Sequence, residues 1–268
     1  MSSSENSPSI TVLMAEYNTD PDRLRAAIRS ILAQTETDFE LLIVDDGGSN
    51  DVDAIAEEFM DPRIRVVGYG ENRGFVAALN YGWRRARGAY IARMDTDDTV
   101  ESSYLAEVFS FLKENPEFSV VSGQAVEFST DGVSLVHGRP GEVSPKSLMR
   151  GGAPIHAASM LRREALESVG GYPVYRRAED LALWCELLLA DRRLYILPKV
   201  LYHYRVDASD FAKRRLSNRG DEIRVRLRYY PKLGAGPREY LRVCQSVASG
   251  LLPVGLVRWI RARMHVRA

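Results

Sequence analysis

The sequence predicts an α/β protein built on a mostly parallel sheet flanked by helices. From residue 10 to residue 118, short apolar runs alternate with amphipathic stretches, which is the pattern of strand–helix units around such a sheet. Two of the apolar runs end directly in acidic residues, and in open α/β sheets ligands bind at the carboxyl ends of the strands. The chain has 268 residues, enough for a large core in one or two domains.

The first strand and helix are marked by an apolar run and a capping signal. Residues 10–14 are apolar and predict a buried strand. Asp20 and Pro21 then supply a helix N-cap and a proline at the first helical position. The helix is expected to end near Gln34, with four apolar residues on one face: Leu24, Ile28, Ile31 and Leu32.

Three more strands are expected in the first half of the chain. They lie at 39–44, 64–67 and 89–94, and the last two are followed by helices at 75–87 and 104–113. The first and third of these strands run straight into acidic residues. Because parallel strands end at the same edge of a sheet, these acids are expected to share one edge.

The pattern changes after residue 118. Residues 118–140 resemble a hairpin around Asp131 and Gly132, and residues 141–212 mix short strands with an apolar helix from about residue 180 to 189. We therefore expect a smaller, mixed subregion beside the parallel sheet, and then a helical extension. The predicted parts are a disordered or extended N-terminus (1–9), one domain (10–212, with halves 10–117 and 118–212) and a basic extension (213–268).

Charge is balanced over the whole chain but unevenly placed. Residues 213–268 carry 14 Lys and Arg against 3 Asp and Glu, about +11, while the first 212 residues carry 22 against 33, about −11. An acidic body repels nucleic acid, so none is expected as a partner. The basic tail suits an anionic membrane surface or the acidic body itself, and residues 251–266 suit an interfacial helix, a solvated basic face or an oligomer contact.

Cysteine usage and the N-terminus predict a cytoplasmic protein. Cys185 and Cys244 lie far apart and lack metal-ligand spacing, so they are expected to be buried thiols in a reducing compartment. Residues 1–9 lack the features of a secretory signal, and no stretch approaches the roughly 18 apolar residues of a membrane-spanning helix. The inner face of the cytoplasmic membrane is the alternative location.

The acidic cluster Asp95-Thr96-Asp97-Asp98 follows the strand at 89–94. Carboxylates on alternate residues can project to one side, and Mg²⁺ or Mn²⁺ prefers one or two such oxygens together with phosphate oxygens and water. Such a metal neutralises charge that builds on a departing diphosphate. The alternative is that these residues cap a helix that starts near Glu101.

A second acidic pair, Asp45-Asp46, follows the strand at 39–44. One of these carboxylates is placed to accept hydrogen bonds from a ribose hydroxyl or a base N–H, unless both serve only the turn through Gly47 and Gly48. The glycines in residues 68–74 have the wrong spacing for a dinucleotide fingerprint. Asn72, Arg73 and Gly74 still open a helix whose N-terminus suits a polar or anionic ligand.

The third acidic pair, Glu179-Asp180, opens the helix at 180–189. A carboxylate at a site mouth takes a proton from an attacking hydroxyl if burial or nearby charge raises its pKa. The alternative is again a helix cap. His203 is a candidate contact for the metal or the diphosphate, weighed against the usual role of a lone histidine as a hydrogen-bonded core group.

Six segments in order resemble glycosyltransferase family 2, whose members have the GT-A fold. They are residues 15–18 (Ala-Glu-Tyr-Asn), 30–35, 38–47, 71–74, 87–98 and 178–184. The context Arg93-Met94-Asp95 resembles a subset that builds bacterial surface polysaccharides.

The resemblance implies a metal-dependent transfer from a UDP-sugar. Asp95 and Asp97, with His203 as a further candidate, would hold Mn²⁺ or Mg²⁺ against the diphosphate. Asp180 would be the base that deprotonates the acceptor hydroxyl, so that one displacement inverts the anomeric carbon.

The resemblance also implies the donor contacts. Tyr17 would lie on the uracil ring, and Asp45 or Asp46 would bind the base or the ribose. The other expected donor contacts are Ala15, Glu16, Asn18, Asn72, Arg73, Gly74, Asn80, Arg93, Met94 and Thr96.

Transfer of a single sugar to a saccharide or lipid-linked acceptor is expected, in cell-surface polysaccharide or glycolipid synthesis. Processive members carry a Gln-x-x-Arg-Trp segment, whereas here Arg258-Trp259 is preceded by Gly255. Two alternatives remain: a degenerate, non-catalytic nucleotide-binding module, and a sugar-phosphate nucleotidyltransferase. The second would show a glycine-rich loop with a lysine, and residues 14–20 contain neither.

Overall fold

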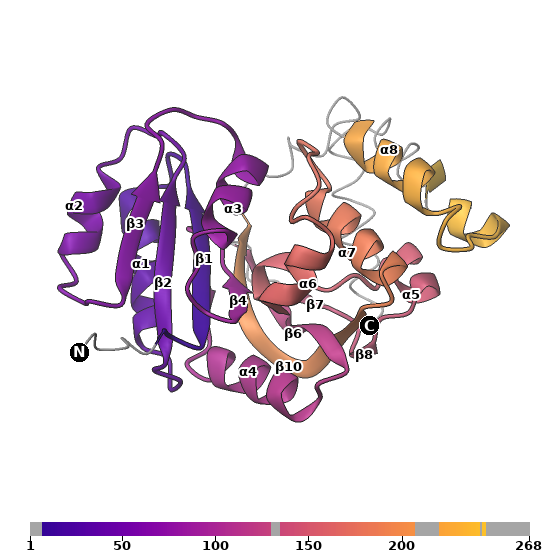
Figure 1. The fold of residues 1–268 in the computed structure, drawn as a ribbon, viewed down its shortest axis with the longest axis horizontal. Helices are drawn as coiled ribbons and strands as arrows, with labels where there is room; N and C mark the ends of the chain where they lie inside the picture. Colours follow the sequence, from indigo (N-terminus) through magenta and orange to yellow (C-terminus); the bar gives the residue numbers. More distant parts are fainter. Residues whose placement is uncertain (1–6, 130–134, 207–219, 242, 245–268) are drawn as a thin grey trace, which may run out of the picture.

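A ten-stranded mixed sheet with helices on both faces forms the body of the protein (Figure 1). The structure is a computed structural model, and it describes residues 7–129, 135–206, 220–241 and 243–244. The main path of the sheet runs β3-β2-β1-β4-β9-β6-β10-β5, with β7 paired to β6 and β8 paired to β10. The α/β prediction is confirmed.

The first four strands are parallel, as the sequence predicts. They are β1 (Ile10–Glu16), β2 (Phe39–Asp45), β3 (Ile64–Gly68) and β4 (Tyr90–Arg93). In the register, Glu16 of β1 lies beside Asp45 of β2, so the ends of these strands share one edge. This carboxyl edge is where the predicted acidic residues gather.

The helices between these strands follow local signals. They are α1 (Pro21–Leu32), α2 (Val52–Glu57) and α3 (Phe75–Trp83). Asp20 caps α1 by accepting from the backbone N–H groups of Asp22 and Arg23, as predicted. α3 ends at Trp83 rather than near residue 87, because the chain must then pass close to β1: a Cβ on Gly88 would lie 2.5 Å from the backbone of Ile10 and Thr11.

The second half of the sheet is mixed. Its strands are β5 (Thr99–Val100), β6 (Phe118–Ser129), β7 (Leu135–His137), β8 (Gly141–Glu142), β9 (Ser159–Arg162) and β10 (Arg193–Val206). β9 runs antiparallel to both β4 and β6, which joins the two halves into one sheet. The predicted hairpin is the antiparallel β6–β7 pair, and its turn at Asp131 and Gly132 lies outside the described residues.

Helices cover both faces of this half. They are α4 (Tyr104–Glu114), α5 (Pro145–Met149), α6 (Arg163–Ser168), α7 (Glu179–Leu189), α8 (Gly220–Tyr229) and the short 3₁₀ helix η1 (His156–Ala158). Alternate residues of β1 enter two separate cores, with Val12 and Met14 on the side of α1 and α4 and Leu13 on the side of α3 and α7. Each face of the sheet therefore has its own core.

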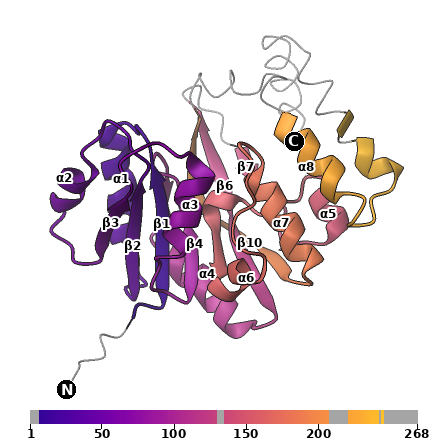
Figure 2. The same cartoon turned by 45° about the horizontal axis from the view of Figure 1, so that its top comes forward.

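The described part of the predicted extension packs on the domain. α8 lies against α7 (Figure 2), with Val225 and Tyr229 buried and the Tyr229 hydroxyl donating to Glu186 at 2.6 Å. Residues 251–266, the predicted interfacial helix, lie outside the described residues. None of the helices in the described ranges has the length and apolar character needed to cross a membrane. Cys185 is buried as expected, whereas the prediction for Cys244 is wrong, since it is exposed.

Candidate active site

The loops after β1 and β2 are tied together at the carboxyl edge of the sheet. Glu16 is fully buried and accepts from the backbone N–H of Thr19 and the amide of Asn50, both at 2.9 Å. Asn18 has a left-handed backbone (φ 56°) and accepts from the N–H of Ser49 at 2.6 Å. Between them Tyr17 is 51% exposed, so these contacts present an aromatic ring on a fixed loop.

Asp45 and Asp46 have different surroundings. Asp46 is 2% exposed and accepts from the Tyr69 hydroxyl and from the backbone N–H groups of Arg73 and Gly74 at 2.9 and 3.0 Å. It therefore fixes the start of α3. Asp45 is only partly buried and accepts from the N–H of Gly47 at 2.9 Å. Of the predicted pair, Asp45 is the carboxylate with surface left for a ligand.

The loop that Asp46 holds is exposed at its tip. Asn72 is exposed, and the Arg73 guanidinium pairs with Glu71 at 2.8 Å and lies 4.7 Å from the Tyr69 ring centre. Gly74 has a φ of 91°, a left-handed conformation that favours glycine, and α3 begins at the next residue. These three predicted residues thus lie together at the N-terminus of α3.

Arg93 and Asp95 form a buried ion pair at the end of β4. Arg93 is 4% exposed and donates to Asp95, and its guanidinium lies 5.0 Å from the Phe75 ring centre. The Asp95 side chain keeps 27% of its surface. The Thr96 and Thr19 hydroxyls are 2.6 Å apart, which links this loop to the one after β1. Asp95 is therefore held from one side and open on the other.

Asp98 anchors the end of β10. It is 3% exposed and accepts from the Tyr202 hydroxyl at 2.9 Å and from the N–H of Arg205 at 2.8 Å. Burial, helped by the charge of Asp95, raises the pKa of Asp98 to about 7. The N-cap of α4 is Ser103, so the helix-cap alternative for Asp98 is wrong.

The predicted metal ligands do not form a closed cluster. Among the described residues, no three or more His, Cys, Asp or Glu side chains gather as a metal site. The structure does not bring His203 into such a cluster: β10 pairs antiparallel with β5, His203 lies opposite Thr99, and its Nε2 lies 2.6 Å from Glu101. A role for His203 at the metal stays a prediction. Asp95 still fits a hard cation, because Mg²⁺ and Mn²⁺ commonly take one or two carboxylates and complete their shell with phosphate oxygens and water.

Glu179 and Asp180 open α7 from a strained position. The residue before them, Ala178, is left-handed (φ 64°), and its side chain makes no cap. The Asp180 carboxylate accepts from the first-turn N–H of Leu181 at 2.7 Å, so the helix-cap alternative stays open beside the role of base. Burial raises the pKa of Asp180, and burial together with the charge of Asp180 raises the pKa of Glu179 to about 7.

One cavity of about 880 Å³ brings the predicted pieces together. It is lined by Arg93 at the end of β4, by Asp95 just after that strand, and by Glu179 and Asp180 from α7. Its opposite wall comes from α8 and the residue that follows it, through Glu222, Arg226 and Tyr230. A carboxylate that suits a metal and a carboxylate with a raised pKa thus face one space, and this combination is typical of a catalytic site.

Comparison with known families identifies the group to which this site belongs. The model of glycosyl transferase family 2 matches residues 11–170, more than half of the chain. The chain belongs to glycosyl transferase family 2.

Curated relatives of this family 2 glycosyltransferase cover most of its length. EpsE of Bacillus subtilis, provisionally described as a glycosyltransferase, is 27% identical over 256 residues, covering 93% of this chain and 92% of EpsE. The amylovoran biosynthesis glycosyltransferase AmsE of Erwinia amylovora is 27% identical over 213 residues, covering 76% of this chain and 79% of AmsE.

Solved structures with the same fold confirm the GT-A expectation. TarS 1-349 of S. aureus in complex with UDP-GlcNAc has a TM-score of 0.70 at 18% identity, covering 91% of this chain and 71% of that one. The mannosyltransferase PcManGT of Pyrobaculum calidifontis, in complex with GDP-Man and Mn²⁺, has a TM-score of 0.70 at 18% identity, covering 98% of this chain and 81% of that one.

Two residues expected to contact the donor belong to the framework of the family 2 domain. The Asn80 amide donates to the carbonyl of Tyr172 at 2.8 Å and accepts from the Trp83 indole at 2.8 Å and from the N–H of Tyr172 at 3.0 Å. Met94 is 1% exposed and packs in the core on the α1 side. Both side chains make contacts within the protein, and these contacts take the place of the expected contacts with the donor. Ala15 is partly buried at the end of β1.

The α8 wall was missed by the sequence analysis. Glu222 and Arg226, which pair at 2.6 Å, have the i,i+4 spacing of a helical ion pair, and that was the available signal. It predicts a helix but not where the helix packs.

Proposed function

We propose that this glycosyltransferase moves one sugar from a UDP-sugar to a hydroxyl of a saccharide or lipid-linked acceptor, with inversion and with the aid of Mn²⁺ or Mg²⁺. The observation that carries the proposal is that Asp95, from the first half of the domain, and Asp180, from the second half, line the same cavity.

The carboxyl edge supplies the donor half. The exposed ring of Tyr17 and the partly buried Asp45 stand on neighbouring loops and suit a uracil ring and a ribose or base N–H. Asp95 and Asp97 would hold the metal, which supplies charge neutralisation for the departing diphosphate. Arg93, buried beside Asp95, orients that carboxylate through its hydrogen bond.

Asp180 supplies the acceptor half. Its raised pKa suits a carboxylate that takes up a proton near neutral pH. The hydroxyl oxygen bonds to the anomeric carbon, the hydroxyl proton passes to Asp180, and the bond from that carbon to the diphosphate oxygen breaks with its electron pair leaving on UDP. A single displacement of this kind inverts the configuration.

The names of related proteins support the class of donor and product. TarS 1-349 was solved with UDP-GlcNAc and PcManGT with GDP-Man and Mn²⁺, both nucleotide-sugars, and AmsE is named for amylovoran biosynthesis. These names support a role in the synthesis of a cell-surface polysaccharide or glycolipid.

The test is nucleotide release across a panel of UDP-sugars and GDP-mannose with Mn²⁺ and saccharide acceptors. Wild type is compared with Asp97→Ala and Asp180→Asn, and with Glu40→Gln at the opposite edge of the sheet as control. We expect release from UDP donors by the wild type and the control only. Binding of UDP without turnover of any donor would instead favour the non-catalytic module, and equal activity in all variants would overturn the proposal.

We also propose that the basic C-terminus brings the enzyme to the inner face of the cytoplasmic membrane. Of the residues after 250, four are arginines and none is acidic. Vesicles with anionic lipid should bind the full chain, and binding should weaken with salt. A chain truncated after Gly250 that binds the vesicles equally well would contradict this.

A further inference from the structure

A second cavity of about 640 Å³ lies beside the catalytic one. It is bounded by the loop of residues 169–176 and by α8. Arg176 lines both cavities, and it precedes Asp180 by one turn of chain. The second cavity is therefore a continuation of the space where the acceptor hydroxyl would meet its base.

α8 forms the wall between the two cavities. Glu222 and Arg226, four residues apart, face the catalytic cavity, whereas Asp221, Arg224 and Arg228 face the second one. These are adjacent stripes of one helix. Val225 is fully buried and seats the helix on the domain, so both stripes have fixed positions.

The acidic groups of the second cavity already have partners. Asp221 accepts from the Arg224 guanidinium at 2.7 Å and from the N–H of Arg176 at 3.1 Å. Glu186 accepts from the Tyr229 hydroxyl at 2.6 Å. The lining as a whole holds three arginines against two acids, so one positive charge is in excess.

Two of these arginines have no acidic partner within the described residues. Within the described part of the chain, neither Arg176 nor Arg228 makes an ion pair, and the Arg228 guanidinium contacts only the Tyr229 ring, 5.7 Å from its centre. Both side chains are exposed. Guanidinium groups in this state suit a carboxylate or a phosphate, which they bind through paired N–H donors.

The loop that carries Arg176 is held in place. Tyr172 is fixed by two hydrogen bonds to Asn80, at 2.8 and 3.0 Å. Gly171 has a φ of 98°, and a Cβ there would lie 2.5 Å from the Asn80 oxygen, so only glycine allows this approach. An anchored loop places its arginine at less entropic cost than a mobile one.

We infer that the second cavity is an acceptor subsite that binds an acidic group, carboxylate or phosphate, on the saccharide, with Arg176 and Arg228 as its ligands. The inference rests on the proposed function, which supplies the saccharide acceptor whose hydroxyl reacts at Asp180. It adds that the natural acceptor is anionic, with its charged group on a sugar next to the one that reacts.

The test measures binding of three disaccharide probes without nucleotide, by ligand-observed NMR titration. The probes are cellobiose, its uronic acid form and its 6′-phosphate, so that the two acidic arms separate carboxylate from phosphate. We expect at least one acidic probe to bind the wild type about tenfold tighter than cellobiose. Arg176→Met should abolish this preference, Arg228→Met should reduce it, and Arg176→Lys should retain part of it.

Arg84→Met is the matched control, because Arg84 is also an exposed arginine over an aromatic ring, 4.9 Å from the Trp83 centre, but outside the second cavity. Its probe affinities should equal those of the wild type. Equal binding of all probes by the wild type, or an unchanged preference in Arg176→Met, would overturn the inference. If nucleotide release fails while the preference holds, the proposed function fails and the anion site stands. If release succeeds while the preference is absent, only this inference fails.

Discussion

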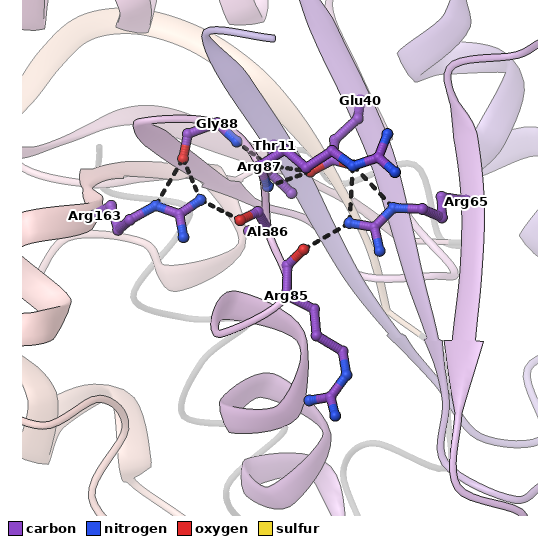
Figure 3. Close-up of polar contacts among 8 residues, drawn as sticks. All are labelled: Thr11, Glu40, Arg65, Arg85, Ala86, Arg87, Gly88 and Arg163. Atoms are coloured by element: carbon purple, nitrogen blue, oxygen red, sulfur yellow. Dashed lines mark hydrogen bonds and ion pairs between the residues drawn. The ribbon is translucent and has the colours of Figure 1, made fainter. Parts of the chain in front are cut away.

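The buried charged groups at the two edges of the parallel sheet differ in how completely they are hydrogen-bonded. At the amino edge, Glu40 is 5% exposed and both of its oxygens are hydrogen-bonded (Figure 3). One accepts from the Thr11 hydroxyl at 2.7 Å and the N–H of Arg87 at 2.6 Å, and the other accepts from the Arg65 guanidinium at 3.0 Å. This carboxylate is fully partnered.

The same network at the amino edge holds the turn between α3 and β4. Arg65 also donates to the carbonyl of Arg85 at 2.6 Å, and Arg163 donates to the carbonyls of Ala86 and Gly88 (Figure 3). Gly88 in turn donates to the Thr11 hydroxyl at 2.9 Å. Strands β1, β2 and β3 and helix α6 are thereby joined to one turn.

At the carboxyl edge the polar groups are left incomplete. Glu16 Oε2 and Arg93 Nε are buried without a hydrogen-bond partner among the described residues, and Asn18 and Ala178 have left-handed backbones. Glu179 and Asp180 have raised pKa values. A satisfied network stabilises a fold, whereas strain and unsatisfied groups persist where function requires them. The difference is what we expect if the reaction takes place at the carboxyl edge.

The largest expected effect is on the base. Asp180→Asn keeps the shape of the side chain but cannot accept the hydroxyl proton, so kcat should fall by about 10³-fold. The affinity for UDP, measured by calorimetry, should stay within about threefold of wild type if Asp180 acts only on the acceptor. A variant that keeps its kcat would remove Asp180 from the mechanism.

The metal should matter nearly as much. Chelation with EDTA should lower the transfer rate by about 10² or more, and Mn²⁺ should restore it in the wild type, because the metal stabilises the departing diphosphate. Asp97→Ala should show the lower rate with or without Mn²⁺. Full activity in EDTA would contradict the metal assignment.

Substitutions at the amino edge should lower the stability of the protein and leave its catalytic rate nearly unchanged. Glu40→Ala leaves the Arg65 guanidinium without its carboxylate partner and opens the network, which should cost about 3 kcal/mol of unfolding free energy in urea denaturation. The kcat of the folded fraction should stay within about twofold of wild type. Glu58→Ala, which removes an exposed pair with Arg25, is the control and should leave the urea midpoint almost unchanged. A large loss of kcat in Glu40→Ala would break the contrast between the edges.

The smallest expected effect is on the pH profile. Since the base must be deprotonated and burial raises the pKa of Asp180, kcat/KM should fall as pH decreases, with the acidic limb above the usual range of an aspartate. Glu222 faces the same cavity and adds a smaller upward contribution to that pKa. Glu222→Gln should therefore move the limb to lower pH by less than about one unit. A shift to higher pH would contradict this placement of Glu222.

The strands and the acidic residues at their ends were predictable from the sequence. Strands buried on both faces are mostly apolar, and residues 10–14, 39–44 and 89–94 are apolar except for Thr11, Glu40 and Arg93 in the interior of these runs. The six-residue α2 was not predicted, since it is too short to show a helical period. The insertion of β9 between β4 and β6 was also beyond reach, because strand order depends on contacts distant in sequence.

For the site, the sequence showed which residue types were available but not which contacts each side chain makes. Asp45 and Asp46 look alike in the sequence, and only the packing of Tyr69 and the α3 N-terminus shows that Asp46 is a framework residue. His203 was predicted as a metal contact because histidine is a common ligand, yet the strand register places it beside Glu101. The α8 wall required the tertiary packing of a helix that follows the matched motifs.

A crystal structure with bound UDP and Mn²⁺ is the sharpest test of the donor site. We expect the uracil ring on Tyr17, the diphosphate at the carboxyl edge, and an anomalous manganese peak within about 2.0–2.4 Å of an Asp95 or Asp97 oxygen. Nucleotide bound away from this edge, or manganese held by His203 and Glu101 instead, would contradict this expectation.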